Sequence, residues 1–132
     1  MSESIQFTVP MCPPSVNDYV RHFRSGRHVK TKEARTWEQE AALAIREQLD
    51  GLHVVGKRFF VVLDIWLGAG MRLDVDNGNK CALDAIAANG LLRNKKGERM
   101  SDSHIKRLTV NIHDSEKDRA IGPRTDIEIG VL

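Results

Sequence analysis

The sequence predicts a small α+β domain in which a mixed β-sheet carries two helices on one face, in the order β-α-β-α-β-β. Three observations lead to this prediction. Four segments show the two-residue alternation of strands, and two segments show apolar residues at helical spacing. The third is size: 132 residues suffice for one real core, so we take 1–132 as a single domain.

The strands are expected where apolar side chains recur at every second position, at residues 5–9, 57–67, 105–113 and 127–131. The second of these segments is apolar on both of its faces, with Asp64 as the exception. Apolar side chains on both faces are typical of a strand in the middle of a sheet, so this segment should be central.

The first helix is expected from about Ala34 to Leu49, and the second from the Asp74/Asp76 segment to about residue 88. Both are followed by stop signals for a helix, the dipeptides Asp50-Gly51 and Asn89-Gly90.

The composition, with 41% hydrophobic and 29% charged residues, is that of a soluble globular protein, and no apolar run approaches membrane-spanning length. The N-terminus lacks a signal-peptide pattern, and the two cysteines, Cys12 and Cys81, form neither a metal-type cluster nor a disulfide framework. We therefore expect a cytoplasmic protein.

The net charge of +2 does not indicate a DNA-binding protein, but the basic residues are clustered. Residues 21–35 carry six basic side chains and one acid, and residues 93–99 form a second basic run. Each run is either an ordinary solvated loop or a patch that meets phosphates. The candidate DNA-binding residues are Arg21, Arg24, Arg27, Lys30, Arg72, Lys95 and Lys96.

The most informative stretch is residues 72–80, Arg-Leu-Asp-Val-Asp-Asn-Gly-Asn-Lys. Asp74 and Asp76 lie between the expected central strand and the second helix, and Lys80 follows one helical turn later. A close pair of carboxylates suits Mg²⁺, and an ammonium group suits a phosphate. Asp and Asn also favour helix caps and turns, so ordinary capping remains an alternative.

Two further acids extend this group. Asp76, Lys80 and Asp84 follow i, i+4, i+8 spacing, which predicts a shared helix face and allows a plain Asp76–Lys80 ion pair. We expect Asp84 to be structural. Asp102, just before the third strand, is the candidate third metal ligand, at a loop–strand junction that could reach the N-terminus of the second helix.

With these residues assembled, the chain resembles the RusA family of Holliday junction resolvases over about residues 5–131. The resemblance is carried by four segments: Pro13-Pro14-Ser15-Val16-Asn17, Gly26-Arg27-His28-Val29, residues 74–80 with Leu83-Asp84-Ala85-Ile86, and Ser101-Asp102-Ser103-His104-Ile105.

The resemblance implies a homodimeric, bacterial or phage-encoded endonuclease that acts in DNA recombination and repair. It would cut four-way DNA junctions by paired symmetric nicks, using Mg²⁺ or Mn²⁺. Asp74, Asp76 and Asp102 match the family's catalytic acids and would hold the metal, and Lys80 matches its essential lysine. The chain departs from the family at Ser101, where a second acid is common, and in the longer 93–99 segment.

Three alternatives remain beside this interpretation. One is a nuclease that prefers flaps or replication forks, and another is a non-catalytic module that binds branched DNA, which Ser101 makes conceivable. A phosphohydrolase with an Asp-x-Asp nucleophile is less consistent, because residues 68–72 separate the strand from the motif.

Overall fold

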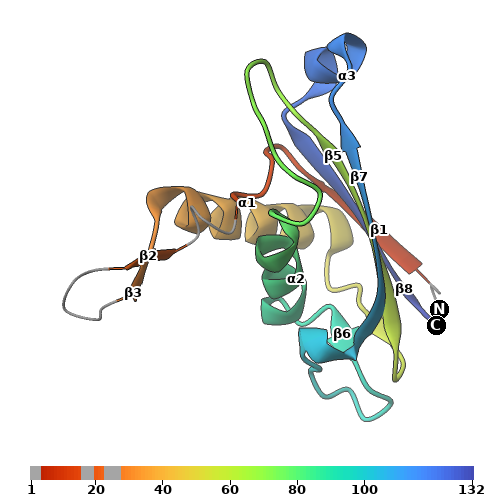
Figure 1. Cartoon of the computed structure of the whole chain (residues 1–132). Coiled ribbons are helices and arrows are strands. Elements are labelled where there is room, and N and C mark those ends of the chain that lie inside the picture. Colours follow the sequence, from red (N-terminus) through yellow and green to blue (C-terminus); the bar gives the residue numbers. More distant parts are fainter. Residues whose placement is uncertain (1–3, 16–19, 23–27) are drawn as a thin grey trace.

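The centre of the fold is a four-stranded mixed sheet (Figure 1), in a computed structural model that describes residues 4–15, 20–22 and 28–132. Across the sheet the strands follow the order β1 (Ser4–Val9), β8 (Arg124–Val131), β5 (Phe59–Trp66) and β7 (Ile105–His113). Strand β8 is antiparallel to β1 and β5, whereas β5 and β7 are parallel. The expected α+β fold with a mixed sheet is confirmed.

Helix α1 (Lys32–Leu49) begins earlier than Ala34, because Thr31 caps it: the Thr31 hydroxyl accepts a hydrogen bond from the Ala34 amide at 3.2 Å. It ends where Asp50 adopts a left-handed conformation with φ 46°. Together with α2 (Asn79–Ala88), it packs on one face of the sheet (Figure 1). Both expected stop signals are confirmed, since Asn89 caps α2 and Gly90 follows with φ 68°.

The core lies between this helix layer and the sheet. The helix-facing side chains of β5 are completely buried: Phe59, Val61, Leu63 and Ile65. The opposite face of β5 is only half-buried at Phe60, Val62 and Trp66. Strand β5 is therefore central, as its apolar pattern predicted, but only one of its faces is sealed from solvent.

Several elements were not predicted from the sequence, because they are too short to show a periodic pattern of hydrophobic residues. Strands β2 (Val20–His22) and β3 (His28–Lys30) form an antiparallel pair, and β4 (Val54–Val55) and β6 (Leu92–Arg93) form a parallel pair. A 3-10 turn, η2 (Asp102–His104), precedes β7, and α3 (Glu116–Ile121) joins β7 to β8. In the described part of the chain, none of the helices is long and apolar enough to cross a bilayer.

Candidate active site

The two acids of the 72–80 stretch lie on an exposed turn between β5 and α2. The Asn77 amide donates to the Asp74 carbonyl at 3.0 Å, and the Asn77 side chain donates to the Asp74 carboxylate at 3.4 Å. Asp is a favoured first residue of such turns. Asp74 thus shapes the turn, and the side chains of both Asp74 and Asp76 remain exposed.

Helix α2 begins only at Asn79, so the expectation that Asp76 shares a helix face with Lys80 is wrong. Lys80 instead pairs with Asp84, at 3.5 Å between ammonium and carboxylate. Gly78 is the N-cap of α2. A Cβ there would lie 2.8 Å from the Pro13 ring, so the segment of Pro13 packs against the start of α2 and requires glycine.

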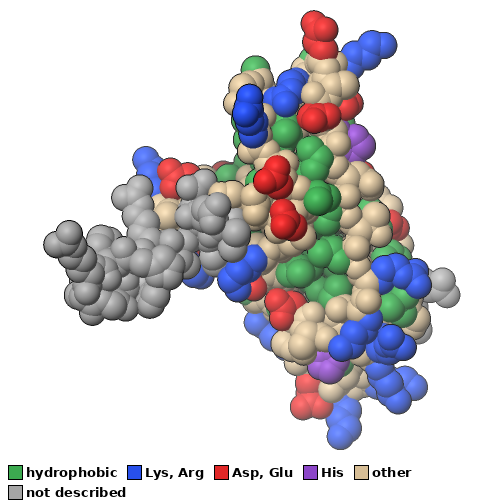
Figure 2. All heavy atoms as spheres, viewed as in Figure 1, with side chains coloured by type: hydrophobic (Ala, Val, Ile, Leu, Met, Phe, Trp, Pro, Cys, Tyr) green, Lys and Arg blue, Asp and Glu red, His purple; other side chains and the backbone are tan. Residues whose placement is uncertain are grey.

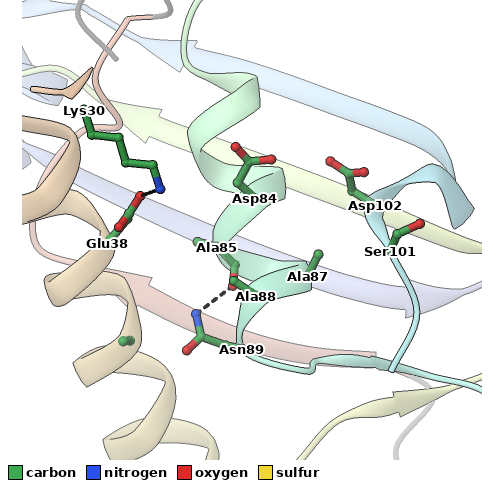
Figure 3. A pocket seen from close by; sticks show the side chains of 10 residues that line it. Lys30, Glu38, Asp84, Ala85, Ala87, Ala88, Asn89, Ser101 and Asp102 are labelled. Atoms are coloured by element: carbon green, nitrogen blue, oxygen red, sulfur yellow. Dashed lines mark hydrogen bonds and ion pairs between the residues drawn. The ribbon is translucent and has the colours of Figure 1, made fainter. Parts of the chain in front are cut away.

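Asp102 opens η2 and lines a cavity of about 500 Å³ whose other lining residues come mainly from α1 and α2 (Figure 3). The lining also includes Asp84, Ala85 and Ala88, which belong to the middle and end of α2. The structure thus places Asp102 with the middle and end of α2, and its reach to the N-terminus of this helix stays a prediction. The carboxylates of Asp84 and Asp102 point to the same side of the cavity (Figure 3).

The structure thus places the four acids in two pairs along one helix: Asp74 and Asp76 ahead of α2, and Asp84 and Asp102 at the cavity. In the described residues, no group of three or more acid, histidine or cysteine side chains could hold a metal ion. Asp84, for which we expected a buried or structural role, lines the cavity and pairs with Lys80. Its i, i+4 spacing from Lys80 was the signal that marked it.

One buried atom beside the acidic turn lacks a hydrogen bond. The side-chain oxygen of Asn79, the first residue of α2, is buried without a partner in the described structure. Such an orphaned oxygen is normally satisfied by a bound water or ion. Asp74 and Asp76, on the exposed turn just before Asn79, offer oxygen donors of the kind that divalent cations prefer.

Of the candidate basic residues, Arg72 is exposed in the same loop as Asp74. Lys30 lines the cavity and pairs with Glu38 of α1 (Figure 3). Arg21 lies in β2, but its side chain, like the whole of Arg24 and Arg27, lies outside the described part of the molecule.

The 93–99 run divides into structural and exposed members. Arg93 donates to the Gly90 carbonyl at 3.0 Å and Arg99 to the Ala88 carbonyl at 3.3 Å, so both secure the end of α2. Lys95 and Lys96 are exposed at the tip of the loop. Lys and Arg side chains gather at this end of the molecule, near β6 and η2, whereas acids lie along the face of α2 (Figure 2).

Arg119 of α3 is a positioning residue that the sequence analysis missed. Its guanidinium donates to the carbonyls of Gly68 and Met71, at 2.7 and 2.9 Å, and to the Asp114 carbonyl at 3.0 Å. It therefore ties α3 to the 68–71 loop that leads to Asp74. No periodicity marks such a residue, because its contacts depend on the docking of two distant segments.

Fold and site together define a class: a small α+β protein whose paired carboxylates and adjacent lysine suit chemistry on phosphodiesters. The comparison with family models identifies it further. The model described as endodeoxyribonuclease RusA matches residues 10–130, so the chain belongs to the RusA family, whose members are Holliday junction-resolving endonucleases. No curated protein matches the chain.

We predict that replacing Arg119 with Met loosens the 68–71 loop, because two carbonyls lose a charged donor worth about 1.5–3 kcal/mol each. Hydrogen exchange should accelerate in residues 68–74 but not in β5. Lys117→Met, an exposed change in the same helix, is the matched control. Equal exchange in the two variants would show that Arg119 does not anchor the loop.

We also predict that the native thiols are inert. Burial, together with the carboxylates of Asp84 and Glu38, raises the pKa of Cys81 to about 12, and burial also raises the pKa of Cys12. At pH 8, iodoacetamide should alkylate Cys81 about 1,000-fold more slowly in the folded protein than in urea.

The same shift has a consequence for stability. The unfolded Cys81 thiol loses its proton near its ordinary pKa of 9.0, whereas the folded one keeps it to about 12. The stability of the fold should therefore be independent of this group below pH 9 and fall between pH 9 and 12. Rapid alkylation of the native protein at pH 8 would contradict both statements.

Proposed function

We propose that this protein is a Mg²⁺-dependent endonuclease that resolves four-way DNA junctions by paired symmetric nicks, in recombination and repair. It would act as a homodimer in a bacterial or phage-infected cytoplasm. The observation that carries the proposal is the alignment of both acid pairs and Lys80 along one helix, in a chain of the RusA family.

Asp74, Asp76 and Asp102 are the proposed metal ligands, with Mn²⁺ as a substitute for Mg²⁺. Mg²⁺ usually keeps several waters and takes one or two protein carboxylates together with substrate phosphates. Separate pairs of acids in the free protein are compatible with this habit, because the phosphate of DNA can supply a remaining ligand. The metal would activate a water and stabilise charge on the phosphoryl oxygens.

Lys80 supplies a compact positive charge for the scissile phosphate. Its ion pair with Asp84 is partly exposed, with 57% of the lysine side chain accessible, so the pair is worth only about 0.3 kcal/mol. Such a weak pair holds the ammonium over the face of α2 without preventing its transfer to a phosphate. Asp84 thus holds the Lys80 ammonium in the free protein until a phosphate can replace the carboxylate.

The exposed basic residues give the surface that would hold DNA by its shape. Lys95 and Lys96 extend from the loop that leads directly into Ser101 and Asp102, and Arg72 flanks the acidic turn. Arg21, Arg24, Arg27 and Lys30 are the proposed contacts from the β2–β3 segment. A two-fold dimer would present two such sites to the symmetric strands of a junction.

The alternatives are tested together with this proposal. A nuclease for flaps or forks would cut those structures in preference to junctions. A non-catalytic binding module is suggested by Ser101, which lines the cavity and hydrogen-bonds the Ser103 hydroxyl at 2.6 Å instead of offering a carboxylate. Cleavage of a mobile four-way junction that requires Mg²⁺ and stops in EDTA would exclude that module.

We expect Asp102→Asn and Asp76→Asn to reduce junction cleavage at least about 100-fold, because each removes a metal-binding charge, while junction affinity stays unchanged. Single-turnover cleavage and binding are measured on four-way, flap and fork substrates. Asp50→Asn, the same change at an exposed helix C-cap that tolerates asparagine, should behave like the wild type. Cleavage by Asp102→Asn at the wild-type rate would remove this residue from the site.

A separate prediction concerns DNA binding by the loop tip. In the Lys95→Ala/Lys96→Ala double variant, the slope of log affinity against log salt should decrease by about 2, one unit for each lost phosphate contact. Lys117→Ala, on α3, should leave the slope unchanged. An unchanged slope in the double variant would mean that the tip is an ordinary solvated loop.

A further inference from the structure

A second cavity adjoins the one that Asp84 and Asp102 line. Its volume is about 330 Å³, and it lies between the end of α1, residues 51–53 and the residues that follow α2. Ala42 of α1 and Asn89 line both cavities, so the two adjoin along the seam between the helices. Asn89 lies at the end of the first cavity that is farther from Asp84 and Asp102 (Figure 3).

The second cavity is basic. Among the described residues that line it, the ionisable side chains are those of Arg46, His53 and Arg93, and none is acidic. None of these three forms an ion pair within the described part of the chain. Glu47, the acid next to Arg46 in the sequence, lines a different cavity near β1. In a chain whose net charge is only +2, this lining is a local concentration of positive charge.

Two guanidinium groups meet beside Gly90, which also lines this cavity. A Cβ at position 90 would lie 2.9 Å from Arg93 Nη2 and 3.0 Å from Arg99 Nε. Other nitrogens of these arginines hold the end of α2. Arg93 donates through Nε and Nη1, to the carbonyls of Gly90 and Gly97, and Arg99 donates through Nη1. The two nitrogens near position 90 therefore keep N–H groups for another acceptor.

The chemistry of this arrangement suits a phosphate group. Two guanidinium groups side by side repel each other, and an anion between them removes the repulsion. A phosphate offers several acceptor oxygens at once, which matches the fork of N–H donors on a guanidinium. Because Gly90 has no side chain, the space where the two groups meet stays open.

We propose that this basic cavity holds a backbone phosphate of the DNA strand that is cut, about three or four nucleotides from the scissile bond. Glu38, Ala42 and Arg46 follow i, i+4, i+8 spacing, so they form a row along α1 from the first cavity to the second. The row is about 12 Å long at 1.5 Å per residue, and a DNA strand advances about 3.4 Å per nucleotide.

This inference rests on the proposed function for the identity of the strand, and on the arginines for the phosphate. A strand that lies along the seam between α1 and α2 has its scissile phosphate at the acids and a further phosphate at the arginines. The two contacts together fix how far the strand can slide. The basic cavity therefore determines which phosphodiester bond reaches the acids.

Methylphosphonate substitution tests the position, because it removes the charge of one DNA phosphate at a time. Junctions with a single substitution at successive positions on either side of the cut are bound in EDTA, where no cleavage occurs. We expect one position, about three or four nucleotides from the cut, at which wild-type affinity falls about tenfold. In Arg46→Gln the same substitution should have no effect, because the contact is already lost.

Arg107→Gln is the matched control. It is the same change at an exposed arginine, beside Phe60 on the face of the sheet away from the helices, and it should keep the wild-type affinity and profile. Circular dichroism verifies that both variants fold. A wild-type profile with no sensitive position at this distance, or an Arg46→Gln variant that keeps the sensitivity, would overturn the proposal.

A charge at position 42 tests the path between the cavities. Ala42 is exposed and lines both of them. Ala42→Glu should bind junctions at least about tenfold more weakly than Ala42→Gln, because only the first places a carboxylate beside the phosphates of the strand. The two side chains have nearly the same bulk, so their ratio isolates the charge. Equal affinities would show that no strand passes between the cavities.

A free phosphate is the other source of the same chemistry. Inorganic phosphate is titrated into the full chain without DNA, and the amide shifts of Gly90 and Leu91 report its binding. We expect half-saturation above about 10 mM, because one isolated phosphate makes few contacts. Half-saturation below about 0.1 mM, with unchanged junction affinity in Arg46→Gln, would assign the cavity to a free anion and overturn the proposal.

The two proposals fail in different ways. A protein that shows the Arg46-dependent position but cuts no DNA in Mg²⁺ would refute the nuclease and support the phosphate site, with positions counted from the branch point. A protein that cuts junctions, but at the same bond and rate in Arg46→Gln, would do the reverse. If both proposals hold, Arg46→Gln should distribute its cuts over neighbouring bonds.

Discussion

The site depends on one buried hydrogen bond between the two helices. The indole of Trp37, a completely buried residue of α1, donates to the Cys81 carbonyl in the first turn of α2 at 3.0 Å. Leaving this indole N–H unpaired in the core would be costly, so the bond fixes how α2 lies against α1. The side chains of Lys80 and Asp84 flank Cys81 and take their positions from it.

A second set of contacts holds the segment ahead of α2. The Pro14 carbonyl accepts from the Cys81 thiol at 3.5 Å, and the Pro13 ring leaves room only for glycine at position 78. On the other side, Arg119 secures the loop that follows β5. The backbone on each side of the acidic turn is therefore held by a tertiary contact, at Gly78 and at residues 68–71. The carboxylates of the turn stay in solvent. Exposed carboxylates suit a cation that keeps part of its hydration shell.

The sequence could predict what local patterns determine. Alternation located the strands, and apolar spacing with Asp50 and Asn89 located the ends of the helices. It did not predict that α2 begins at Asn79. It also could not show that position 78 must be glycine, because the Pro13 ring that packs there is distant in the chain. Nor could it show that Asp102 shares a cavity with Asp84, because the position of η2 beside α2 follows from tertiary packing. The family resemblance identified the candidate acids and Lys80 but gave no information about their positions in space.

The separation of the acids in the free protein has a physical explanation. Four carboxylates brought within a few ångströms of one another would repel strongly unless a cation lay among them. In the described structure, Lys80 offsets Asp84, while Asp74 and Asp76 remain in high-dielectric solvent, so no large repulsion accumulates. Assembly of the site would then be driven by the cation and the phosphate together, because each offsets the charge of the other. On this view, the weak Lys80–Asp84 pair leaves the lysine able to move to a phosphate when DNA binds.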